Sequence, residues 1–102
     1  MSVKPIFFAL DGKHLDNFSR ELEILKGNIY GVKVGLEMFT SEGPSSVEKL
    51  KKDGWTVFLD LKLHDIPNTV GQAAAAVANL KPRFLTVHAS GGQAMITAAA
   101  KE

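Results

Sequence analysis

The stretch FLDLKLHDIP, residues 58–67, combines the pattern of a buried strand with three charged side chains. Side chains alternate along a strand, so Asp60 and Lys62 share one face while Leu59 and Leu61 form an aliphatic opposite face. The aliphatic face is expected to pack against helices. The two charges would then lie on the other face, at the C-terminal end of the strand.

Similar apolar runs recur along the 102 residues, each bounded by glycine, proline or charge, and each is typical of a strand. Helical patterns lie between these runs and after the last of them. We expect strands over residues 5–10, 30–35, 55–61 and 83–88.

An apolar stripe at helical spacing predicts the first helix. After a short helical turn at 37–39, Ser45 with Glu48 forms a possible capping box for a second helix, ending near Lys52. A third helix is expected over 69–80, where four consecutive alanines should permit close packing, and a fourth from about residue 93. The stripe of the first helix consists of Leu15, Phe18, Leu22 and Leu25.

The alternation of strands and helices favours an α/β fold with a parallel sheet and right-handed crossovers. Two architectures fit this order. One is an open doubly wound sheet, and the other is a (βα)4 portion of a TIM (β/α)8 barrel, with parallel strands and outer helices. Because a complete barrel needs about 250 residues, this chain could supply only about half of one.

The composition, 45% hydrophobic and 23% charged with a net charge of +1, is that of a globular protein and argues against disorder. The sequence contains no basic cluster, so nothing in it suggests a nucleic-acid partner. The absence of cysteine excludes disulfides and thiolate metal sites. The apolar run before Asp11 is too short for a signal peptide or a membrane span, so a cytoplasmic location without membrane partners is expected.

Each of the other three strands also delivers a polar residue at its C-terminal end, namely Asp11, Lys33 and His88. Any one of them could simply meet solvent. However, the C-terminal ends of parallel strands are where both architectures build ligand sites, and all four strands carry such a residue. The pattern therefore predicts a site at this end of the sheet.

Asp60 and Lys62 lie roughly 7 Å apart along a strand, within reach of an ion pair. Asp65 follows the strand, and its loop could fold back or reach a neighbouring chain. Nearby carboxylates favour the charged form of Lys62, which suits a proton donor or an electrostatic clamp rather than a Schiff-base nucleophile. The carboxylates could instead bind Mg²⁺, although the ammonium group competes for their oxygens, or the cluster could be a simple salt bridge.

The stretch FLDLKLHDIPNTV, residues 58–70, contains DxKxxD and closely resembles the signature of the orotidine 5′-monophosphate decarboxylase family. FALD ending at Asp11, VKVGLEMFTSEGP around Lys33 and TVHASGG around His88 extend the resemblance over essentially the whole chain. DxKxxD is shared with Mg²⁺-dependent sugar-phosphate relatives, the ketogulonate-phosphate decarboxylases and hexulose-phosphate synthases. Lys33 and the IPNT continuation at 66–69 favour a resemblance to the orotidine enzyme over one to these sugar-phosphate relatives.

The resemblance implies decarboxylation of orotidine 5′-monophosphate to UMP in pyrimidine biosynthesis, without cofactor or metal, by a homodimer with shared active sites. Lys62 would be the proton donor to C6 of the pyrimidine, and Asp60 would sit beside the departing carboxylate. Asp65 would complete the charged network from across the dimer interface, while Asp11 and Lys33 would hold ribose hydroxyls. The remaining substrate-binding residues would be Ile66, Asn68 and Thr69, with Thr69 contributed by the partner chain.

The resemblance also implies that residues 1–102 form the N-terminal half-barrel of a single (β/α)8 decarboxylase domain. The family's second half supplies the phosphate-gripping loop and the polar contacts to the pyrimidine. We therefore expect a fragment with little or no activity alone, whose open edges favour self-association. The alternatives are a Mg²⁺-dependent sugar-phosphate decarboxylase or lyase, and a non-catalytic half-barrel self-association module.

Overall fold

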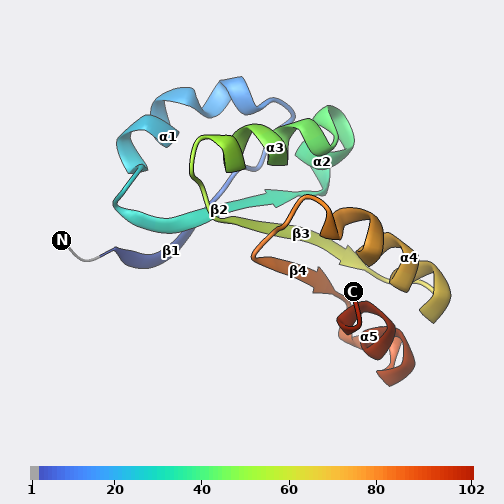
Figure 1. Cartoon of the computed structure of the whole chain (residues 1–102). Coiled ribbons are helices and arrows are strands. Elements are labelled where there is room, and N and C mark those ends of the chain that lie inside the picture. The colour runs from blue at the N-terminus through green and yellow to red at the C-terminus, as the bar shows by residue number, and fades with distance from the viewer. Residues whose placement is uncertain (1–2) are drawn as a thin grey trace.

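The computed structural model describes residues 3–102 and contains one sheet of four parallel strands in the order β1-β2-β3-β4 (Figure 1). A doubly wound sheet reverses its strand order at a switch point, whereas a barrel keeps the order of the sequence. The unbroken order therefore confirms a portion of a (β/α) barrel. The strands are β1 (Lys4–Ala9), β2 (Ile29–Gly35), β3 (Val57–Leu63) and β4 (Phe84–Val87).

Helical segments fill every connection and follow the last strand (Figure 1). The first predicted helix is divided, because its apolar stripe begins in a 3-10 turn and continues in an α-helix. The short turn predicted near residue 37 is a two-turn helix, α2. The segments are η1 (Leu15–Phe18), α1 (Ser19–Leu25), α2 (Leu36–Glu42), α3 (Pro44–Lys52), α4 (Pro67–Ala78), η2 (Ala89–Gly91) and α5 (Gln93–Ala100).

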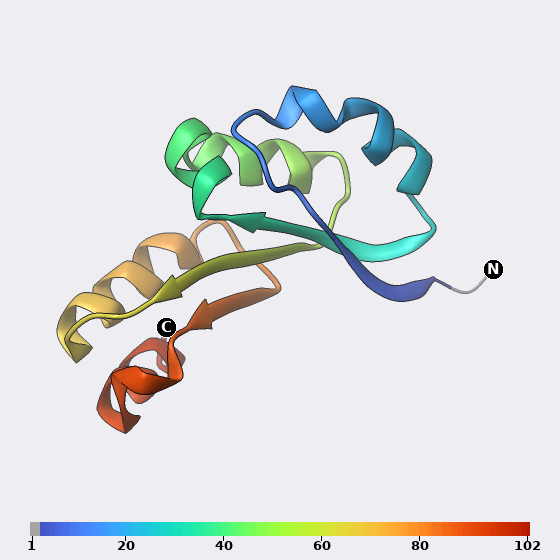
Figure 2. The ribbon, with the colours of Figure 1, turned by 180° about the vertical axis from the view of Figure 1, so that it is seen from behind.

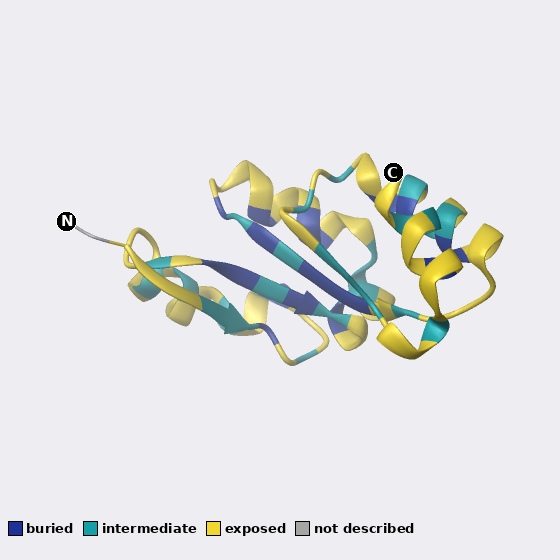
Figure 3. Ribbon diagram, turned by 90° about the horizontal axis from the view of Figure 1, so that it is seen from below, coloured by how far each residue is buried: buried dark blue, intermediate teal, exposed yellow. Residues whose placement is uncertain are grey.

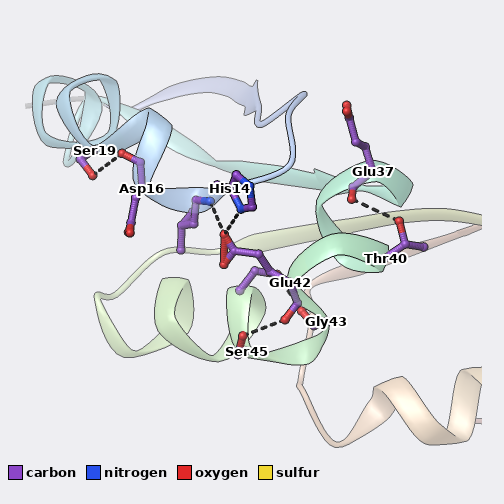
Figure 4. A network of polar contacts seen from close by, with 10 residues as sticks. His14, Asp16, Ser19, Glu37, Thr40, Glu42, Gly43 and Ser45 are labelled. Atoms are coloured by element: carbon purple, nitrogen blue, oxygen red, sulfur yellow. Dashed lines mark hydrogen bonds and ion pairs between the residues drawn. The ribbon is translucent and has the colours of Figure 1, made fainter.

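The predicted capping box at the start of α3 is wrong. The helix begins at Pro44, with Gly43 as its N-cap at a φ of 68°, and no side chain caps it. Proline suits the first helical position because its φ is already helical and it has no N–H to satisfy. Ser45 is therefore inside the helix, where its hydroxyl donates to the Glu42 carbonyl at 2.9 Å (Figure 4).

The predicted aliphatic face of the sheet forms the main core. Helices α1, α2 and α3 lie over this face, as the opposed views of Figures 1 and 2 show. The valines of β2, together with Val57 and Leu59 of β3, are fully buried there. The helices contribute Met38, Val47 and Leu50, which are also fully buried, so the helix-facing assignment is confirmed.

The opposite face carries an aromatic cluster. Within residues 3–102, no helix lies over this face (Figure 3). The ring of Phe7 packs edge-on against Phe58 and Phe84, with centroids 5.4 and 6.0 Å apart. Gly31 lies against Phe7, because a Cβ at this position would come within 2.9 Å of the ring and would collide with the Thr56 carbonyl oxygen. Phe84 remains 44% exposed, so this face is open to solvent.

Helices α4 and α5 pack together around a second, smaller core of Val70, Ala74 and Met95. Their approach is close, since a Cβ on Gly71 would lie only 3.6 Å from the Cβ of Ala98. The expectation that the alanine-rich helix packs closely is therefore confirmed. Among residues 3–102, no helix combines the length and apolar character needed to cross a membrane.

A polar contact fastens the loop after β1 to the end of α2 (Figure 4). The carboxylate of Glu42 accepts a hydrogen bond of 2.6 Å from the Leu15 backbone N–H, and the same oxygen lies 3.7 Å from Nδ1 of His14. This loop also contains Asp11. The contact therefore helps to hold the Asp11 segment beside the C-terminal end of the sheet.

Candidate active site

Asp60, in the middle of β3, is the centre of a charged cluster. It is only 6% exposed, and its Oδ2 lies 2.8 Å from Nζ of Lys62 and 3.2 Å from Nζ of Lys33. The ion pair predicted between Asp60 and Lys62 is confirmed. The structure adds Lys33 to the same carboxylate oxygen.

The parallel register between β2 and β3 explains how Lys33 reaches Asp60. Asp60 is paired with Gly35, and Lys33 stands two residues earlier on β2, on the same side of the sheet. Glycine at position 35 places no side chain between the lysine and the carboxylate. A Cβ added there would meet no atom within 4 Å, so the space in front of this part of β2 is open.

The backbone at Lys62 departs from regular strand geometry. Its φ is 51°, in the left-handed region, and the register of β3 against β4 shifts between Leu59 and Leu63. Such bulges redirect side chains and are frequent next to active sites. The other non-glycine residue with positive φ in the described chain, Lys81, follows a helix end, where this conformation is common. Only Lys62 adopts it within a strand.

Thr86 of β4 joins the cluster through its hydroxyl group. The hydroxyl donates to Oδ1 of Asp60 at 2.7 Å and accepts from the backbone N–H of Lys62 at 2.9 Å. Sequence reasoning placed no function on Thr86. A signal was present, because Thr86 stands two residues before His88 and faces the same side of the sheet as the other strand-end residues.

The cluster holds Asp60 in its ionised form. Burial alone would raise the pKa of Asp60, but hydrogen bonds from Lys62, Thr86 and Lys33, joined by the Coulombic attraction of Lys62, outweigh burial. Together they lower the pKa of this carboxyl from 3.8 to about 2. Two ammonium groups therefore share one carboxylate, and the three side chains carry a net charge of +1. This arrangement suits a group that bears or develops negative charge.

The electrostatics of the cluster disfavour a divalent cation at Asp60, because the oxygen that would bind the metal already faces two ammonium groups. Within residues 3–102, no three histidine, aspartate or glutamate side chains gather in a way that could hold a metal ion.

The residues after the strand lie apart from the cluster. Asp65, Ile66, Asn68 and Thr69 are all exposed at the start of α4. The Asp65 carboxylate accepts a hydrogen bond of 2.7 Å from the Ile66 N–H, and across residues 3–102 it forms no ion pair with a lysine. Of the two alternatives left open by the sequence, folding back onto the cluster is therefore not the one this chain adopts.

Asp11 and His88, at the outer strands, are also exposed. The backbone N–H of Leu10 donates to the Lys33 carbonyl at 2.9 Å, which places Asp11 beside the end of β2. His88 stacks on His64 with ring centroids 4.8 Å apart, and its Nδ1 lies 2.6 Å from Oγ of Ser90. His88 thus belongs to a separate contact in the loops after β3 and β4.

The fold and the cluster together define a class of protein: a parallel (β/α) barrel portion with an ion-paired lysine centre at the carboxyl ends of its strands. Comparison with protein families identifies the family within this class. Residues 4–102 match the model of the orotidine 5'-phosphate decarboxylase / HUMPS family, and the chain belongs to this family.

Individual relatives agree with the family assignment. The chain is 46% identical over 94 residues to the orotidine 5'-phosphate decarboxylase of Sphingopyxis alaskensis, covering 92% of this chain and 42% of that relative. The crystal structure of orotidine 5'-phosphate decarboxylase from Lactobacillus acidophilus is 43% identical, with a TM-score of 0.83 over 94% of this chain and 43% of that one. The corresponding structure from Pyrococcus horikoshii is 27% identical, with a TM-score of 0.86 over 93% and 46%. The chain thus spans less than half the length of these relatives.

Proposed function

We propose that this chain carries the acid–base centre for the decarboxylation of orotidine 5′-monophosphate to UMP. The observation that carries the proposal is the placement of the Lys62 ammonium group, 2.8 Å from the buried carboxylate of Asp60, in a chain of this family. The low pKa of Asp60 supports it, because an ionised carboxylate attracts the Lys62 ammonium group and holds it at this place. A protonated lysine is the form that a proton donor requires.

In the proposed reaction, the bond between C6 of the pyrimidine and its carboxylate breaks, and the electron pair stays on C6 as CO₂ departs. Lys62 then transfers a proton to C6, which yields UMP. A preplaced ammonium group interacts more strongly with the developing carbanion than with the neutral ring carbon, so it lowers the barrier selectively. Asp60 lies beside the departing carboxylate and orients Lys62. No cofactor or metal takes part.

The remaining residues receive binding roles. Lys33 and Asp11 hold the ribose hydroxyls from the ends of the neighbouring strands β2 and β1. Asp65 and Thr69 act in the site of a second subunit within a homodimer, which accords with their exposure and with the lack, among residues 3–102, of an ion pair between Asp65 and a lysine. Ile66 and Asn68, on the same segment, line the nucleotide.

We further propose that residues 1–102 are the first half of a single cytoplasmic (β/α)8 domain and turn over little or no substrate by themselves. The chain spans 42% of a curated relative, and barrel enzymes commonly bind phosphate after strands seven and eight. Phosphate binding far from the reacting carbon supplies energy that positions the substrate, so its absence lowers the rate as well as the affinity. Formation of UMP by the purified chain at ordinary enzyme rates would contradict this part of the proposal.

A titration with the product tests the function without requiring turnover. UMP added to the ¹⁵N-labelled chain should produce saturable shifts at the ammonium signals of Lys33 and Lys62. The variant Lys33→Ala should weaken binding at least about tenfold, because it removes the charge-assisted hydrogen bond proposed to the ribose hydroxyls. The matched control Lys52→Ala, on the exposed face of α3, should bind as the unaltered chain does.

Other outcomes favour the alternatives. Saturable binding of a sugar phosphate that requires Mg²⁺ and disappears with a chelator, without any response to UMP, would favour a sugar-phosphate lyase. A folded chain that binds neither ligand would favour a self-association module.

A further inference from the structure

We infer that Thr86 is a positioning residue whose hydroxyl sets both the carboxylate of Asp60 and the backbone of Lys62, and so aims the Lys62 ammonium group. No role for Thr86 is part of the function proposed above. The inference rests on the proposed function only for the role of the Lys62 ammonium group as a proton donor.

The first step concerns which partner contacts each of the two oxygens of the Asp60 carboxylate. A hydroxyl has one proton to donate and lone pairs with which to accept. Thr86 uses its oxygen to accept from the Lys62 N–H, and its proton is then directed to Oδ1 of Asp60. Both ammonium groups contact the other oxygen, Oδ2. The hydroxyl thus occupies one carboxylate oxygen and leaves the second for the lysines.

The second step concerns the backbone of Lys62. A left-handed conformation is unfavourable for a residue with a Cβ, and it persists only where surrounding contacts hold it. The register shift between β3 and β4 removes Lys62 from the regular pairing of the ladder. The Thr86 hydroxyl takes the place of the missing backbone acceptor, so one side chain satisfies an N–H that the bulge would otherwise leave unpaired.

The two contacts together position the Lys62 side chain. The hydrogen bond to the Lys62 backbone N–H holds the Cα from which the side chain starts, and the hydrogen bond to Asp60 holds the carboxylate that the ammonium group contacts. The Lys62 side chain is 62% exposed, so little packing holds it otherwise. Without the hydroxyl, we expect the ammonium group to sample several positions at the mouth of the sheet, and the carboxylate to lose one donor.

The test compares Thr86→Val, which keeps the shape and removes the hydroxyl, with Thr86→Ser, which keeps the hydroxyl. Two signals are measured in the 102-residue chain: the pKa of the Asp60 carboxyl by ¹³C NMR, and the exchange rate of the Lys62 amide proton. In Thr86→Val, loss of one hydrogen bond to a charged group should raise the pKa of Asp60 from about 2 to about 3. The Lys62 amide should exchange about tenfold faster.

Thr86→Ser should restore both signals to those of the unaltered chain. Thr56→Val makes the same chemical change just before β3, at the other end of that strand, and should alter neither signal. If Thr86→Val does not fold, Thr86→Ala offers the same comparison without a second methyl group. A folded valine or alanine variant with an unchanged Asp60 pKa and unchanged exchange at Lys62 would overturn the inference.

Neither signal depends on a nucleotide, so this outcome is independent of the proposed function. If UMP fails to bind while Thr86→Val changes both signals, the positioning role stands and the function fails. If UMP binds and the two signals do not respond to Thr86→Val, the function stands and the positioning role fails.

Discussion

Two groups of predicted site residues are neighbours in sequence and differ sharply in structure. Asp60 and Lys62 are in mutual contact, and Asp60 is buried among partners from three strands. Asp65 and Thr69 follow within a few residues but are exposed at the start of α4. The strand ends at Leu63 and the chain turns into a helix at Pro67, which carries the second group away from the first.

The difference separates side chains that contact one another within one chain from side chains that are exposed in that chain. Both oxygens of the Asp60 carboxylate have partners within one chain, namely Thr86 on Oδ1 and the two lysines on Oδ2. The segment at the start of α4 presents side chains outward, where they contribute little to the fold of their own chain. Substitutions in the two groups should therefore have very different effects on stability.

The largest effect is expected from Asp60→Ala. Removal of the carboxylate leaves two ammonium groups facing each other without an anion, and breaking a buried ion pair typically costs about 3 kcal/mol or more. Because Lys62 is largely exposed, we expect a loss near the lower end, about 3 kcal/mol, measured by urea denaturation at pH 7. Asp53→Ala, at the exposed end of α3, is the control and should change stability by less than about 0.5 kcal/mol. Similar effects for both variants would remove the distinction between the two regions.

A smaller effect is expected from acid. The folded pKa of Asp60, about 2, lies below its ordinary value of 3.8, so the folded state binds this proton less readily than the unfolded state does. The corresponding stabilisation is fully present above the unfolded value and is lost as the pH falls through the folded one. It amounts to about 2 kcal/mol.

The acid effect is measured as the difference between the unaltered chain and Asp60→Asn, followed by denaturation from pH 6 down to pH 2. The stability difference between the two chains should shrink by that amount over this range. A constant difference would show that Asp60 titrates normally in the folded chain.

The smallest effect is expected from Asp65→Ala. This variant loses the hydrogen bond from the Asp65 carboxylate to the Ile66 N–H, which is exposed to water and worth about 0.5 kcal/mol. Thermal and urea unfolding of this variant should be nearly those of the unaltered chain. A loss as large as that of Asp60→Ala would show that Asp65 supports its own chain after all.

Much of the fold followed from sequence patterns. Alternation along β3 correctly separated the buried Leu59 from Asp60, and the order of strands and helices predicted the parallel sheet. The start of α3 was predicted wrongly, because a capping pattern at Ser45 competed with Pro44 and the proline at the first helical position prevailed. Local patterns are ambiguous where two start signals overlap by one residue.

The contacts of the candidate site also include some that the sequence predicted and some that it did not. The pairing of Asp60 with Lys62 was predictable, since it depends on a spacing of two residues in one strand. Lys33 was predicted to face this end of the sheet, but its ion pair with Asp60 depends on the register of β2 against β3. Thr86 was missed because its contacts require the bulge at Lys62, and short-range patterns do not reveal a shift in pairing with a later strand.

The sequence by itself determined the parallel α/β architecture, the polarity of each strand face and the presence of charges at the strand ends. These features depend on periodicity and composition, which act over a few residues. Only the tertiary structure decided that Lys33 and Thr86 join Asp60, because contacts between strands depend on register and on the backbone conformation of one residue, Lys62. It also decided that Asp65 stands apart, since the direction of the chain after a strand is set by the packing of the following helix.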